Sequence, residues 1–71
     1  MILFDGKVGK TYIVKSINAG YRATKRLTDM GITPTIEVKL LNTLGPIMVE
    51  VRESRLAIGR GLAKKIEVEE K

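Results

Sequence analysis

Apolar side chains alternate with polar ones in several short segments of this chain, and this period of two limits its fold more than any other feature. In residues 36–41 every second residue is aliphatic, starting with Ile36, and residues 47–52 repeat the pattern. Such alternation is typical of a half-buried β-strand. Residues 42–46 (NTLGP), between the two runs, have the composition of a hairpin loop. The sequence therefore predicts a β-hairpin here.

Three further strands are predicted at residues 11–17, 55–58 and 66–69, from their β-branched and alternating apolar side chains. Glu53 and Ser54 leave room only for a tight reversal before the fourth strand. Residues 59–65 interrupt the alternation and predict a single helical or 3₁₀ turn. Five short strands with tight links predict a mainly-β fold, a small barrel that closes on itself and hides its strand edges.

Residues 21–30 predict a short helix between the first two strands. Its predicted inner face consists of Ala23, Leu27 and Met30, which recur at spacings of four and three. Gly31 suits the left-handed backbone that follows many helices, and Pro34 prevents the helix from resuming. A turn of this kind places Ile32 against Leu27.

The 71 residues include no cysteine and no histidine. Their absence removes disulfides, thiolate nucleophiles, zinc sites of the usual nitrogen and sulfur kind, and the commonest general base. No apolar run approaches the roughly 18 residues that cross a bilayer, so we expect a cytoplasmic location and no membrane insertion. We interpret residues 1–71 as one domain that binds a partner, uses no cofactor and catalyses no reaction.

The charge of the chain is positive and unevenly distributed. The formal net charge is +5, and residues 66–71 contain three of the eight acidic side chains. Residues 1–65 contain 12 basic and 5 acidic side chains, a net charge of +7. This excess favours an acidic partner, which is a protein surface, a nucleic acid or a phospholipid.

Short motifs in a fixed order cover nearly the whole chain. They are residues 26–35 (RLTDMGITPT), a hairpin that ends in Gly45 and Pro46, residues 55–58 (RLAI) and residues 62–66 (LAKKI). Together these motifs resemble the FeoA family, ferrous iron transport protein A. The resemblance implies an SH3-like barrel with a helical insertion after the first strand. It also implies a cytosolic accessory of the membrane ferrous iron transporter, whose cytosolic part is a GTP-binding domain.

The chain departs from the family pattern in three places. The family usually has glycine at the position of Thr35, glycine in the turn of Glu53 and Ser54, and arginine at Gly59, where this chain has Arg60 one place later. The same fold occurs at the C-terminus of metal-dependent repressors, so a stand-alone relative of that domain is an alternative. The family is often associated with transition-metal ions, and we expect any link to iron to be through the partner.

Two groups of residues are predicted to bind the partner. Arg22, Lys25 and Arg26 lie on the outer side of the predicted helix and suit an acidic surface, and the alternative is an ordinary solvated face. Leu27 is first a core residue. Its loss would weaken binding indirectly, because the helix would be misplaced.

Leu41, Leu44 and Met48 form the second group, near the predicted hairpin loop. The alternation puts Leu41 and Met48 on the outer side of their strands and Leu44 at the loop tip. Exposed apolar patches often mark protein contact sites. The alternative is that residues 1–4 or the helix cover them. An exposed hairpin or an unpaired strand edge also makes weak self-association an expectation.

Other chemistries have weaker support in the sequence. Glu37, Glu50 and the acidic tail are candidate oxygen ligands for a hard cation, yet no metal site is predicted. Residues 59–61 (GRG) lack the lysine and hydroxyl residue of a P-loop, and nothing selects one arginine to reach a nucleotide of the partner. A basic nucleic-acid-binding barrel is the rival function, although the chain has only three aromatic residues for stacking: Phe4, Tyr12 and Tyr21.

Overall fold

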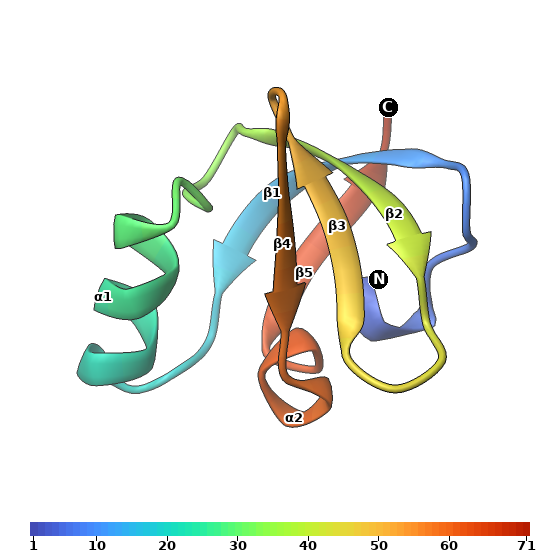
Figure 1. Ribbon diagram of the computed structural model, residues 1–71. Coiled ribbons are helices and arrows are strands. Elements are labelled where there is room, and N and C mark those ends of the chain that lie inside the picture. Colours follow the sequence, from blue (N-terminus) through green and yellow to red (C-terminus); the bar gives the residue numbers. More distant parts are fainter.

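The computed structural model describes residues 1–71 and contains five strands, two helices and a 3₁₀ turn (Figure 1). In chain order they are η1 (Leu3–Asp5), β1 (Thr11–Ile17), α1 (Tyr21–Asp29), β2 (Glu37–Asn42), β3 (Ile47–Val51), β4 (Ser54–Ile58), α2 (Arg60–Ala63) and β5 (Ile66–Glu70). The predicted strands, the helix after the first strand and the helical turn before the last one are all present. The fold is therefore mainly β, as the alternation indicates.

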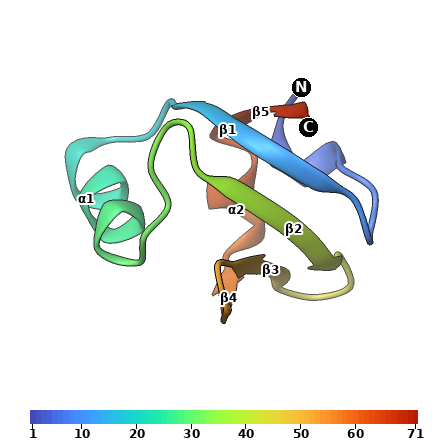
Figure 2. The same ribbon diagram turned by 90° about the horizontal axis from the view of Figure 1, so that it is seen from above.

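All five strands form one antiparallel sheet in the order β4-β3-β2-β1-β5, which curves around the interior (Figure 2). The ladder does not close, because β4 and β5 stand at its two ends and α2 connects them. The prediction that closure hides both edges is therefore wrong. The outer edge of β5 is instead covered by the N-terminus, where Ile2 bridges Glu67 and the Val68 N–H donates to the Met1 carbonyl at 2.7 Å. β4 keeps a free edge.

The interior is a single cluster of 14 buried hydrophobic residues, and no polar side chain is buried with them. The strands supply most of it through the alternation seen in the sequence, for example Val38 and Leu40 of β2. Fully burying one such aliphatic side chain stabilises the fold by roughly 1.5–3 kcal/mol. Tyr12 is the largest member, and its hydroxyl accepts a hydrogen bond of 2.8 Å from the Lys7 backbone N–H.

The end of α1 has the geometry that the sequence predicts. Gly31 has φ +91°, and its N–H donates to the Thr28 carbonyl at 2.9 Å. On the predicted inner face Leu27 is buried, whereas Ala23 and Met30 are half-buried. The helix thus packs against the core mainly through the Leu27 side chain, and its opposite face is exposed to solvent.

Two turns place ordinary residues in the left-handed backbone region that favours glycine. The β3–β4 reversal consists of Arg52 and Glu53, because Val51 already pairs with Ser54, so the turn lies one residue earlier than predicted. Arg52 has φ 59°, as the first residue of a two-residue hairpin loop often requires. Thr35 has φ 76°, and its N–H donates to the Val14 carbonyl at 2.8 Å.

Candidate partner-binding surfaces

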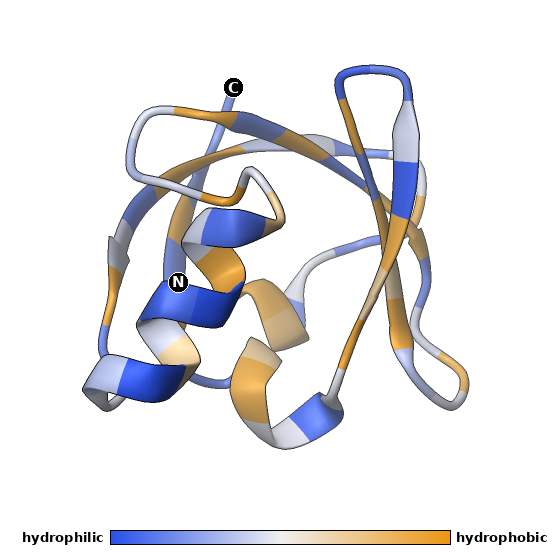
Figure 3. Cartoon of the chain, turned by 60° about the vertical axis from the view of Figure 1, so that its left-hand side comes forward, coloured by the Kyte–Doolittle hydropathy of each residue, from blue (hydrophilic) through white to orange (hydrophobic).

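The outer face of α1 carries the first predicted group, and all three side chains are exposed. Lys25 Nζ lies 3.6 Å from Asp29 Oδ2 in an i,i+4 ion pair. Arg22 and Arg26 have no carboxylate partner, so their charges are available to another molecule. Figure 3 shows the hydrophilic colouring of this forward face of α1. Leu27, in contrast, is 0% exposed and is a core residue that orients the helix.

The β2–β3 hairpin carries the second predicted group, and its members differ in exposure. Leu44 is 82% exposed at the loop tip, whereas Leu41 and Met48 are half-buried. The strand register shifts between Leu40 and Asn42, so Leu41 lies at a bulge and has no partner directly opposite. The strongest apolar feature of this hairpin is therefore one leucine rather than a patch of three residues.

The two predicted groups are separated in space. Figures 1 and 2 place α1 at one side of the sheet and the β2–β3 loop at the other, in both directions of view. The structure thus offers two distinct candidate surfaces, a cationic helix face and an apolar loop tip.

Arg60 is a candidate residue that sequence reasoning did not assign to either group. Its guanidinium Nη1 donates hydrogen bonds of 3.0 Å to the carbonyls of Thr43 and Gly45. The guanidinium carbon also lies 5.0 Å from the centroid of the Phe4 ring. The sequence singles out Arg60 as the centre of a Gly-Arg-Gly stretch and as an arginine one place after the family position, but its contacts depend on tertiary structure that no local motif specifies.

The acidic tail is paired with basic groups at one side of the sheet. Glu67, Glu69 and Glu70 lie 3.2, 3.4 and 2.6 Å from the Met1 amino group, Lys15 Nζ and Lys10 Nζ, respectively. The hydrogen bond and the charge of Glu70 raise the pKa of Lys10, and those of Lys10 lower the pKa of Glu70. The tail therefore neutralises the Met1 amino group, Lys10 and Lys15, and the basic side chains without an ion pair lie elsewhere, among them Arg22 and Arg26 of α1 and Arg60 of α2.

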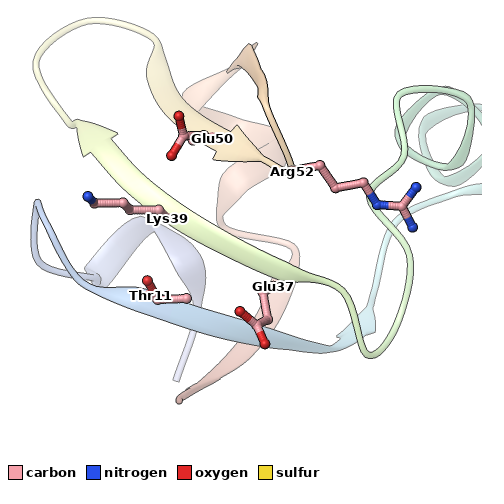
Figure 4. A pocket seen from close by; sticks show the side chains of 5 residues that line it. All are labelled: Thr11, Glu37, Lys39, Glu50 and Arg52. Atoms are coloured by element: carbon pink, nitrogen blue, oxygen red, sulfur yellow. The ribbon is translucent and has the colours of Figure 1, made fainter.

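The outer face of the sheet has a shallow hollow of 340 Å³ with a wholly polar lining (Figure 4). Its lining residues are Thr11, Glu37, Lys39, Glu50 and Arg52. The strand register aligns Thr11, Lys39 and Glu50 in one row across three strands, and Arg52 extends away from the others. Glu37 is paired with Lys71 at 3.0 Å. Because charges of both signs alternate here, the hollow does not single out one class of ligand.

The family model described as the FeoA domain matches residues 1–70. This chain belongs to the FeoA family. It is 46% identical, over 65 residues, to a Methanocaldococcus jannaschii protein provisionally named Fe(2+) transport protein A, and the match covers 90% of this chain and 79% of that relative. FeoA proteins are non-enzymatic accessories, and the chain is thereby a protein of ferrous iron transport.

Solved structures of FeoA proteins have the same fold as this member of the family. A crystal structure of FeoA described as an iron uptake regulatory protein superposes with a TM-score of 0.92 at 35% identity, covering 100% of this chain and 96% of the other. Stenotrophomonas maltophilia FeoA with zinc, described as an SH3 domain protein, has a TM-score of 0.85 at 24% identity, with 97% and 89% covered. The SH3-like fold is confirmed. No helix of the chain has the length and apolarity required to cross a membrane.

Proposed function

We propose that this FeoA-family chain is a cytoplasmic regulator of ferrous iron uptake that acts as one domain over residues 1–71. It docks on the cytosolic GTP-binding domain of the membrane transporter and shifts that domain between conformations that it already samples. The observation that carries the proposal is the family match over residues 1–70, because it links the whole chain to ferrous iron transport. Binding, rather than chemistry, is the action expected of a non-enzymatic accessory.

The cationic face of α1 supports docking on an acidic surface of that domain. Arg22 and Arg26 are exposed and have no ion pair of their own, so a partner's carboxylates would not have to displace an internal contact. Exposed charges of this kind mainly raise the association rate and make it sensitive to salt. We therefore assign α1 the role of guiding the encounter.

The test measures binding of the full chain to the purified cytosolic domain by calorimetry, with association rates at two salt concentrations. The variant is Arg22→Gln with Arg26→Gln. Lys7→Gln with Lys39→Gln is the matched control, because it removes the same charge from two other exposed cations without an ion pair. The arginine variant is expected to associate several-fold more slowly and with a weaker salt dependence, whereas the control keeps most of the wild-type rate.

Each outcome of this titration has a definite meaning. No binding by the wild-type chain overturns the proposed function. Equal reductions of the association rate in both variants would mean that the net charge of the chain, and not the α1 face, guides the encounter. The same titration with single-stranded DNA tests the nucleic-acid alternative, because phosphate contacts give a steep salt dependence. Tight DNA binding in the absence of domain binding would favour that alternative.

A further inference from the structure

The loop between β2 and β3 is held by α2 from outside the hairpin. Arg60 of α2 donates from one nitrogen, Nη1, to the carbonyls of Thr43 and Gly45, at 3.0 Å each. These two residues are the immediate neighbours of Leu44 in the chain. Figure 1 shows α2 and the loop at the same end of the sheet. Arg60 is therefore hydrogen-bonded to the backbone on both sides of Leu44.

The hairpin itself fixes the remaining backbone group at the tip. The Leu44 N–H donates to Asn42 Oδ1 at 3.0 Å, and Gly45 has φ +76°, which lets the chain turn back toward β3. The N–H of Leu44 and the carbonyls on either side of it are thus all hydrogen-bonded. The side chain nevertheless stays 82% exposed. Ordering a loop reduces its conformational entropy, which opposes folding. In this loop the burial of the tip side chain Leu44 does not offset that cost, because the side chain stays exposed.

Arg60 is itself anchored to the body of the fold. Its guanidinium carbon lies 5.0 Å from the centroid of the Phe4 ring, and Lys64 Nζ lies 4.8 Å from the same centroid. Phe4 packs against the hydrophobic core. An aromatic ring attracts a cation that lies over its face. The Phe4 ring therefore restricts the orientation of the Arg60 guanidinium independently of the loop. Neither Arg60 nor Lys64 is in an ion pair.

We propose that Arg60 is a positioning residue that presents Leu44 as a preformed apolar anchor for a pocket with an acidic rim on the transporter's cytosolic domain. This inference rests on the proposed function and names the contact through which it operates. An anchor that is ordered in the free chain loses less entropy on binding than a mobile one. Arg60 beside the loop and Lys64 on the same Phe4 ring are in no ion pair, so they complement carboxylates at the rim of such a pocket.

The first experiment asks whether Arg60 orders the loop in the free chain. Backbone relaxation and amide exchange of residues 43–45 are measured by NMR for the wild type and for Arg60→Ala, Arg60→Lys and Lys64→Ala. Both Arg60 variants are expected to increase the motion of the loop, because alanine has no donor and the lysine ammonium ends one bond short of the position that Nη1 occupies. Lys64→Ala is the matched control, since it removes a cation from the same ring and no hydrogen bond to the loop. Unchanged motion in both Arg60 variants overturns the inference.

The second experiment measures affinity for the cytosolic domain in a double-mutant cycle. Leu44→Ala is expected to weaken binding by about tenfold or more, as for a central apolar anchor. Arg60→Ala is expected to weaken it about fivefold in the wild-type background and less than about twofold in the Leu44→Ala background, because it acts through the leucine. Arg60→Lys replaces Arg60→Ala if the latter does not fold, and it separates the lost hydrogen bonds from the lost charge.

The outcomes distinguish this inference from the function on which it rests. No binding by the wild-type chain removes the proposed function and the anchor with it. Wild-type binding that Leu44→Ala leaves unchanged overturns the anchor alone. Additive losses from Leu44→Ala and Arg60→Ala overturn the positioning role, because the two residues would then act separately. Self-association of the free chain that Leu44→Ala abolishes assigns the loop tip to a second copy and overturns the assignment to the transporter.

Discussion

The backbone N–H of Ile32 donates a hydrogen bond of 2.9 Å to the carbonyl of Leu27, and both side chains are 0% exposed. This bond and the one from Gly31 to Thr28 form the paired closure of a Schellman motif. The end of α1 and its attachment to the core are therefore one unit. The cationic face of the helix is oriented by this turn, since Leu27 is the only fully buried residue of α1.

Leu27→Ala is expected to destabilise the fold by about 2–5 kcal/mol, because it removes a buried side chain and leaves a cavity. The free energy of unfolding is measured by urea denaturation. Leu44→Ala is the matched control, since the same atoms are removed from a side chain that is 82% exposed. Its effect should stay within about 0.5 kcal/mol. Similar losses in the two variants would contradict the assignment of Leu27 to the core.

Gly31→Ala is expected to reduce the free energy of unfolding by about 1 kcal/mol, because alanine is strained in left-handed backbone. A Cβ at Gly31 would meet no atom within 4 Å, so crowding makes no contribution. Gly61→Ala provides the control, because Gly61 lies within α2 and is equally open but has no positive φ. Alanine there should be neutral or stabilising by up to about 1 kcal/mol. Effects of the same sign would contradict the backbone explanation.

Thr35→Gly is expected to be neutral or to stabilise the fold by about 0.5 kcal/mol, although glycine normally weakens an ordered segment. Thr35 is β-branched and has φ 76°, a conformation that costs L-residues about 1–2 kcal/mol. Glycine removes that strain from the folded state. It also raises the conformational entropy of the unfolded chain, which cancels part of the stabilisation. Thr33→Gly, two residues earlier and without a positive φ, should only destabilise. Thermal and urea denaturation of both variants measure the difference, and equal losses would show that Thr35 is not strained.

Most of the fold could be predicted because its determinants are local. Alternation identified the strands, and Gly31 with Pro34 identified the end of the helix. The β3–β4 turn lies one residue earlier in the structure than in the prediction. Arg52 adopts a left-handed backbone there, and an arginine side chain gives no reason to expect it. The open ladder could not be predicted, because strand pairing at the ends of a sheet depends on contacts between distant segments.

The candidate surfaces were only partly accessible from the sequence. The loop position of Leu44 followed from the hairpin pattern, and its high exposure agrees with that placement. The separation of α1 from the hairpin did not follow, since no sequence pattern states where two elements lie relative to each other. The contact of Arg60 with the loop could not be predicted. Its partners lie 15 and 17 residues away in the chain, and they are backbone carbonyls, which every residue has whatever its side chain. The roles of both surfaces in binding stay predictions.

The ion pair of Lys10 and Glu70 joins β5 to the segment before β1, and it predicts how pH acts on this end of the sheet. Lys10 Nζ donates to Glu70 Oε1 at 2.6 Å. That hydrogen bond, followed by the opposite charge, lowers the pKa of Glu70 below its ordinary value of 4.5 and raises the pKa of Lys10 above 10.5. A lowered carboxyl pKa stabilises the fold above pH 4.5, and the effect is lost as the pH falls through the folded-state value.

The raised pKa of Lys10 acts in the opposite direction, stabilising the fold below pH 10.5 and losing its effect as the pH rises through the folded-state value. Both contributions are present at neutral pH, and both are small and sensitive to salt because the two side chains are exposed. Lys10→Gln should therefore return the pKa of Glu70 toward 4.5, which an NMR titration of its carboxyl carbon measures. Lys64→Gln removes the same charge from a residue outside the pair and should leave that titration unchanged. An unaltered Glu70 midpoint in Lys10→Gln would mean that the pair does not persist in solution.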